Sequence, residues 1–151
     1  NNQAQRAPAP PPAAALPASP PAADMRRQYD NAMSLLGRAQ YAQASQAFRM
    51  FADAYPDDPR AGTAVYWTGE LAYSSTHDYD EAARNFAEVL KNYPMTARAS
   101  ESMLKLGLSL FEIGQAKAGC DTLAALPAKY PTANAAFLQR ARNERRDRNC
   151  R

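Results

Sequence analysis

The sequence has little of what enzymes use to build an active site. It contains one histidine, His77, and it has neither a glycine-rich phosphate-binding loop nor the nucleophile motif of the α/β-hydrolases. Carboxylates are scattered along the chain, and no spacing predicts that two of them share a cleft. We therefore expect no catalytic residues and no cofactor, and we interpret the protein as a non-enzyme.

Long apolar runs are also absent. No stretch approaches the roughly 20 apolar residues of a membrane-spanning helix, so we expect no direct membrane insertion. A secretory signal is missing as well, and the first residue is Asn1 rather than methionine. This beginning is typical of a mature product or a fragment.

Metal-binding residues are few. Two cysteines cannot make a structural zinc site without other soft ligands. His77 stands with Asp78, Asp80 and Glu81 in a predicted turn, but a single imidazole beside carboxylates on a turn is a weak metal signal. Capping of the following helix by Asp78 or Asp80 explains the acids more simply. We expect no metal site.

A helical pattern recurs along the chain and is clearest over residues 64–94. Gly69 in a first helical segment, Ala82 and Phe86 in a second, and a closing Pro94 have the spacing of the tetratricopeptide pattern. The closing step, tyrosine followed by proline, recurs at intervals of 38 and 37 residues: Tyr55-Pro56, Tyr93-Pro94 and Tyr130-Pro131. A fixed period of this size indicates stacked helix pairs rather than an unrelated helical bundle.

The pattern predicts an all-α tetratricopeptide-repeat solenoid of three helix pairs and a C-terminal capping helix. The domain should span residues 25–151, with repeats over 25–58, 60–95 and 97–131 and a cap over 132–149. Asp24 and Thr132 are the expected N-caps of the first and last helices. Residues 1–24 hold seven of the twelve prolines, and we interpret them as a disordered Pro/Ala-rich linker.

The positive charge is concentrated at the C-terminus. Residues 1–134 carry 12 Lys/Arg and 13 Asp/Glu, whereas residues 135–151 carry six arginines and two acids. A basic helix of this kind suggests nucleic acid or a membrane surface. A solvated terminal helix is the simpler interpretation, because no aromatic residues interleave the arginines, and we expect no nucleic-acid partner.

The two cysteines are placed to form a bridge. Cys120 lies near the start of the second helix of the third repeat, and Cys150 lies at the end of the capping helix. Consecutive helices in such an array are antiparallel, so the end of the second helix returns beside the start of the first. The sequence therefore predicts a Cys120–Cys150 disulfide and an oxidising compartment, with two free thiols as the alternative.

A partner should bind on the concave face, which the first helices of the repeats line. Alignment of the repeats on Ala32, Gly69 and Gly107 gives aromatic and aliphatic residues at the inner positions, together with Glu70, which we expect to contact a partner's cation. The candidate groove residues are Tyr29, Met33, Tyr66, Glu70, Tyr73, Leu108 and Phe111. Some of them could instead pack between helices, but the phenol tips of Tyr66 and Tyr73 should face water or a partner.

Several short segments of the sequence closely resemble those of one family. These are Tyr66-Trp67-Thr68-Gly69-Glu70, Leu90-Lys91-Asn92-Tyr93-Pro94 and Leu104-Lys105-Leu106-Gly107-Leu108. Over about residues 25–145 the chain resembles the C-terminal repeat domain of the Tol–Pal system accessory protein family, the cell division coordinator CpoB or YbgF family. It departs from the pattern at Gly119, where alanine is usual, and in the turn 74–80, which is one residue longer than its counterpart in the third repeat.

The resemblance implies a periplasmic protein that binds TolA. It also implies a link to the septal peptidoglycan synthase complex, through which outer-membrane constriction is coordinated with septal peptidoglycan synthesis. Family members form homotrimers through an N-terminal coiled coil, which this sequence does not contain. A related periplasmic scaffold, such as the lipoprotein subunit of the outer-membrane β-barrel assembly machine, is the alternative, and a module that binds nucleic acid through its arginine-rich tail is a third.

Overall fold

The computed structural model describes residues 22–151, which form seven α-helices and one π-helical turn, with no strand in this range. The predicted linker lies outside the described residues up to residue 21. The elements are α1 (Ala22–Gly37), α2 (Tyr41–Ala54), α3 (Ala61–Leu71), η1 (Ala72–Thr76), α4 (Tyr79–Asn92), α5 (Ala99–Glu112), α6 (Ala116–Lys129) and α7 (Ala135–Asp147).

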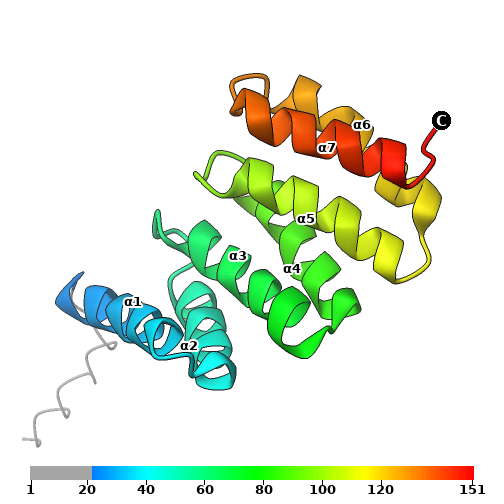
Figure 1. Ribbon diagram of the computed structural model, residues 1–151. Helices are drawn as coiled ribbons and strands as arrows, with labels where there is room; N and C mark the ends of the chain where they lie inside the picture. Colours follow the sequence, from blue (N-terminus) through cyan, green and yellow to red (C-terminus); the bar gives the residue numbers. More distant parts are fainter. Residues whose placement is uncertain (1–21) are drawn as a thin grey trace, which may run out of the picture.

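The helices pair in chain order, as the sequence predicts. Each helix packs against the next one, so α1–α2, α3–α4 and α5–α6 form three antiparallel pairs and α7 covers the end of the array. In Figure 1 the first helices of the pairs and α7 lie side by side on the near side, with α2, α4 and α6 behind them. We call the surface that α1, α3, α5 and α7 share the A-helix face.

Equivalent residues of the second helices build the core. Each second helix carries a large apolar residue and another three positions later that are almost completely buried, and the same spacing recurs in all three repeats. These residues are Phe48 and Phe51, Phe86 and Val89, and Leu123 and Leu126. Burial of one such side chain contributes about 1.5–3 kcal/mol, so the repeated pattern stabilises the contacts between helices in every repeat.

Steric crowding explains why position 119 is a glycine. A Cβ atom at Gly119 would lie 2.9 Å from Cε1 of Phe111 and 3.0 Å from the carbonyl oxygen of Gly107. Real Cβ atoms do not approach a backbone oxygen and a ring this closely, so alanine does not fit between α5 and α6 without a shift. The departure from the repeat pattern therefore reflects the close packing of these two helices.

Two of the expected helix caps are wrong and one is confirmed. Asp78 caps α4, because its carboxylate accepts a 3.0 Å hydrogen bond from the Glu81 amide. Helix α7 begins later than expected, and Asn134 rather than Thr132 accepts the bond from the amide of Ala136. Asp24 lies inside the first turn of α1, where it pairs with Arg27, because the helix extends back through two good helix formers to Ala22.

The longer turn of the second repeat is resolved as a π-helical turn. Residues Ala72–Thr76 continue α3 in π geometry, and His77 then reverses the chain in a left-handed conformation with φ 56°. The hydrogen bond of a π turn spans five residues instead of the four of an α-helix, so the turn takes up one extra residue. The extra residue is thus absorbed inside the helix and does not form a loop.

Candidate partner-binding face and disulfide

The predicted groove residues lie on the A-helix face, but they differ in accessibility. Met33 on α1 is exposed (38%), and Tyr29, Tyr73 and Phe111 are half-buried. Leu108 is a core residue with 4% of its surface exposed. The face therefore presents fewer free apolar side chains than the repeat alignment predicts.

Tyr66 corrects the sequence prediction, since it is 2% exposed and its ring lies in the core. The ring packs against Trp67 and Phe86, with centroids 5.2 and 6.0 Å away. Burial, and then the carboxylates of Glu70 and Glu101, raise the pKa of the Tyr66 hydroxyl well above its usual range. The preference of a phenol tip for water is outweighed here because the next repeat covers the ring.

A cation of the same chain lies beside the ring of every predicted aromatic groove residue. In three of the four cases the cation comes from the next helix of the A-helix face or from the residue just before it. The distances from the cation to the ring centroid are 5.5 Å for Arg60 and Tyr29, 5.1 Å for Arg98 and Tyr66, 5.3 Å for Lys105 and Tyr73, and 4.7 Å for Arg148 and Phe111. Such contacts stabilise by about 0.5–2 kcal/mol each.

Each of these cations is also paired with a carboxylate. The N–O distances are 2.8 Å for Arg60 and Asp58, 2.7 Å for Arg98 and Glu101, 2.6 Å for Lys105 and Glu70, and 3.7 Å for Arg148 and Glu112. The hydrogen bond from Arg60 lowers the pKa of the Asp58 carboxyl. We call each set of ring, cation and carboxylate a triad.

The triads change the chemistry expected of the groove. Glu70 was predicted to contact a partner's cation, but it is already paired with Lys105, and both side chains are largely buried. These cations were not predicted from the sequence, although one signal for them was available. Arg60 and Arg98 each follow the tyrosine of a Tyr-Pro step by five residues, so they recur with the repeat.

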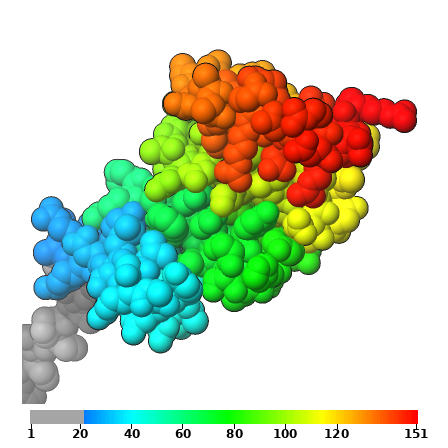
Figure 2. All heavy atoms as spheres, in the orientation of Figure 1, coloured from blue at the N-terminus to red at the C-terminus, as the bar shows by residue number. Residues whose placement is uncertain are grey.

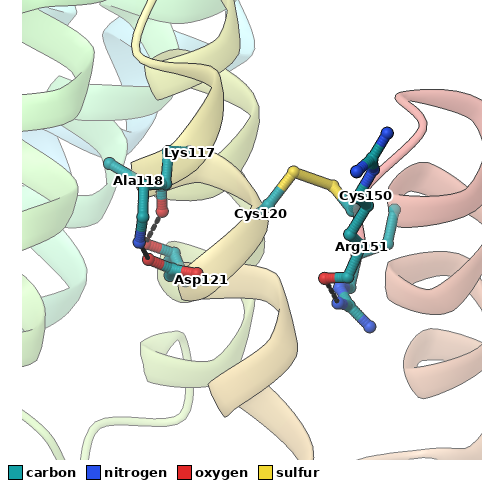
Figure 3. The surroundings of a disulfide bond; sticks show 8 residues. Lys117, Ala118, Cys120, Asp121, Cys150 and Arg151 are labelled. Atoms are coloured by element: carbon teal, nitrogen blue, oxygen red, sulfur yellow. Dashed lines mark hydrogen bonds and ion pairs between the residues drawn. A yellow bond between two sulfur atoms is a disulfide. The ribbon is translucent and has the colours of Figure 1, made fainter.

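The predicted disulfide is confirmed. Cys120 on α6 and Cys150, three residues beyond the end of α7, are bonded, with their Cα atoms 5.5 Å apart. Figure 3 shows the bridge crossing from α6 to the segment that follows α7. It closes a loop with a sequence separation of 30, so the chain from α6 to the C-terminal segment is covalently closed.

The two halves of α7 are held differently. In the first half, Phe137 and Leu138 pack on the core and Ala141 is buried. One and two helical turns after Ala141, the corresponding positions on the same side of the helix hold Arg145 and Arg148 in place of apolar residues. The Nε atom of Arg145 is buried and has no hydrogen-bond partner within the described residues. The second half of α7 is therefore held by polar contacts and by the bridge.

The basic charge of the C-terminus lies mainly in solvent. Arg140, Arg142 and Arg146 are exposed. Arg142 donates hydrogen bonds to Gln139, and Arg146 pairs with the adjacent Asp147. The orange and red part of the space-filling view, Figure 2, shows this terminal segment standing at the surface of the array.

Other features of the described residues offer no alternative site with chemistry of its own. Within residues 22–151, no three His, Cys, Asp or Glu side chains gather as a metal-binding group. In the same range, every helix is too short or too polar to span a bilayer. Open hollows of about 430 and 510 Å³ lie on either side of the turn that contains Met95.

The comparison with protein families decides the class. Models described as tetratricopeptide repeat match residues 29–76, and again residues 63–94 and 101–133. The chain belongs to the tetratricopeptide-repeat family. The matches reach into all three helix pairs, from the middle of α1 to the end of α6, and stop short of α7. Curated proteins provide no match to the sequence.

The family assignment supports a protein–protein interaction module. Tetratricopeptide repeats stack into extended surfaces on which partner segments bind, and no enzyme family matches this chain. The surface of this repeat protein that suits such a role is the A-helix face, with Met33, Tyr73 and Phe111 as its accessible apolar residues.

Proposed function

We propose that this protein is a periplasmic interaction scaffold of the Tol–Pal system, which binds TolA and coordinates outer-membrane constriction with septal peptidoglycan synthesis during cell division. The observation that carries the scaffold role is the array of three tetratricopeptide helix pairs with an A-helix face open to a partner. The choice of TolA and of the septal peptidoglycan synthase complex depends on the sequence phrases that resemble the accessory protein family.

The disulfide supports the proposed compartment. Structural disulfides persist in the bacterial periplasm and are rare in the reducing cytosol. Both cysteines of the chain are used in the Cys120–Cys150 bridge. A periplasmic location is therefore the setting in which this C-terminal segment would be covalently closed.

The partner segment would lie along the A-helix face. Its contacts would include Met33 on α1 at one end, and Tyr73 in the π turn that extends α3 and Phe111 on α5 near the other. Because cations of the chain cover part of each ring, a segment with both apolar and charged side chains suits this surface better than a purely apolar one.

Calorimetry with purified proteins tests the proposal. The full chain, with its bridge intact, is titrated with purified TolA and, in parallel, with the purified β-barrel assembly complex. We expect saturable binding to TolA and none to the assembly complex. Absence of TolA binding at protein concentrations of about 100 μM would overturn the Tol–Pal proposal, and binding to the assembly complex alone would favour the lipoprotein-type scaffold.

Salt dependence separates protein binding from the arginine-tail alternative. Nucleic-acid binding through phosphate contacts weakens steeply as salt rises, with a slope set by the number of contacts. We expect TolA binding to change little between 50 and 200 mM salt. We also expect a duplex oligonucleotide to show no binding above that of a chain with Arg140, Arg142 and Arg146 replaced by glutamine.

A further inference from the structure

We propose that Phe111 and Glu112 form a binding site for an arginine or lysine side chain, that Arg148 occupies this site in the bridged protein, and that reduction of the Cys120–Cys150 bond opens it to a basic residue of a partner. The proposal goes beyond the scaffold role, and it does not require that the partner be TolA.

The chemistry of the site follows from what it already holds. The guanidinium carbon of Arg148 lies 4.7 Å from the ring centroid of Phe111, and a guanidinium nitrogen lies 3.7 Å from Oε1 of Glu112. An aromatic face beside a carboxylate attracts a cation through both the ring quadrupole and the charge. The intramolecular occupant thus shows which kind of side chain the site accepts.

A second ring borders the site. Tyr73 belongs to the same apolar cluster as Phe111. Burial, followed by the negative charge of Glu112, raises the pKa of the Tyr73 hydroxyl, and the positive charge of Arg148 acts in the opposite direction. The charges of Glu112 and Arg148 therefore both reach the Tyr73 hydroxyl, which borders the site.

The position of Arg148 distinguishes this triad from the other three. Arg60 and Arg98 are the N-cap residues of α3 and α5, and Lys105 lies within α5, so packed helices fix them. Arg148 follows the last residue of α7. Its N–O distance of 3.7 Å is the longest of the four. It is the cation that a competitor can replace most readily.

The bridge is what keeps Arg148 in place. The second half of α7 contributes no buried apolar side chain after Ala141. Two residues after Arg148, Cys150 is tied to Cys120 on α6. Without this tie, the contacts of Arg148 with Phe111 and Glu112 would have to hold the last turn on α5.

The opening step is a thiol–disulfide exchange. A thiolate of an external dithiol attacks one sulfur of the bridge, the other sulfur leaves as a thiolate and takes up a proton, and the second thiol of the reductant then releases the first protein sulfur. Two electrons and two protons pass to the protein, which gains two thiols, while the dithiol becomes a disulfide. The reverse exchange with an external disulfide, which becomes a dithiol, re-forms the bridge.

A peptide with the chemistry of the occupant tests the proposal on the full chain. The probe is an eight-residue peptide with the sequence of residues 144–151 and serine in place of the cysteine, added to bridged protein and to protein reduced with dithiothreitol. Binding is followed by NMR through the ring signals of Phe111. We expect saturable shifts in the reduced protein and at least about tenfold weaker binding in the bridged one, because the bond at Cys150 holds Arg148 in the site and so raises its effective concentration there.

Two variants make the outcome specific. In the reduced protein, Glu112→Gln should weaken the binding of the peptide about fivefold or more. Asp57→Asn removes an exposed carboxylate from the turn before α3 and should leave the binding of the peptide unchanged. Equal binding in the bridged and reduced proteins, or binding that is insensitive to Glu112→Gln, would overturn the proposal. TolA binding plays no part in this test, so its result is independent of the proposed function.

Hydrogen exchange distinguishes local opening of the site from unfolding of the last repeat. In the reduced protein, the amides of residues 144–150 should lose protection at least about tenfold, while those of α5 keep theirs. If the amides of α5 lose protection as well, reduction unfolds the last repeat, and the idea of a site that opens locally is wrong.

Discussion

The hydroxyl group of Tyr93 donates a 3.0 Å hydrogen bond to the carbonyl oxygen of Pro56, at the corresponding turn of the preceding repeat. Tyr130 makes the same contact with the carbonyl oxygen of Pro94, at 3.2 Å. Each of these tyrosines also follows the last residue of its own helix, where its amide bonds to the helix. The Tyr-Pro step therefore ends one helix and ties its repeat to the one before.

Loss of this hydroxyl should weaken the contact between the repeats. For Tyr93→Phe we expect the free energy of unfolding to fall by about 0.5–1.5 kcal/mol, the usual net value of one hydrogen bond. Urea unfolding followed by circular dichroism measures the change. Tyr41→Phe is the matched control, because Tyr41 is exposed at the start of α2, and it should unfold as the wild type does. Equal stabilities of the two variants would show that the bond contributes nothing.

Alkaline pH should destabilise the array through Tyr66. Burial raises the pKa of its hydroxyl above the value of 10.0 that an unfolded chain would have. The folded state then holds the proton more tightly than the unfolded state, so stability is fully present below pH 10 and falls as the pH rises further.

Tyr66→Phe removes this source of pH dependence. The loss of stability between pH 9 and pH 11 should be smaller in the variant, and not absent, because burial also raises the pKa of Tyr93 and Tyr130. Unfolding curves at several pH values provide the measurement. Between pH 6 and pH 8 both proteins should respond alike, and an unchanged slope above pH 9 would contradict the prediction.

Gly119→Ala tests the close packing of α5 and α6. The added methyl group would meet the ring of Phe111 and the carbonyl oxygen of Gly107, and backbone cannot yield as a flexible side chain does. We expect a loss of about 1–3 kcal/mol, as for other overpacked sites. At Gly37→Ala nothing lies within 4 Å of the new Cβ atom, so this control should be neutral or slightly stabilising. A wild-type midpoint for Gly119→Ala would show that the helices can separate.

Methionines on opposite sides of the array can locate the partner. Met33 lies on the A-helix face and is 38% exposed, whereas Met50 on α2 is 61% exposed. If TolA binds along the A-helix face, Met33→Ala should weaken binding about fivefold or more and Met50→Ala should not. Calorimetry of both variants decides, and the reverse ranking would place the partner on the α2 side. Neither change removes a core side chain, so helix content should stay the same.

Much of the fold could be predicted from the sequence because the same pattern of residues recurs in all three repeats. The spacing of Gly69, Ala82 and Phe86 indicated a helix pair, and the Tyr-Pro steps marked where the second helix of each repeat ends. The bridge followed from chain direction alone, since consecutive helices are antiparallel and Cys150 had to return toward Cys120.

The candidate site was predicted less well, for a physical reason. Alignment assigns each residue to a helix face, but it does not show what the next repeat lays over that face. Tyr66 was expected to be accessible, and Arg98 covers its ring. Glu70 was expected to be free for a partner, and Lys105 neutralises it. Both corrections come from contacts between neighbouring helices that lie about 35 residues apart in the chain.

The π turn at Ala72–Thr76 has a consequence for how such arrays change in length. The second Tyr-Pro interval is one residue shorter than the first, yet Tyr93 and Tyr130 reach the prolines of their preceding turns alike. The inserted residue therefore changes only the end of its own helix, and the later repeats keep the same contacts with their neighbours. A stacked array of this kind can accept insertions and deletions at this bend, because they do not change which residues of neighbouring repeats contact each other.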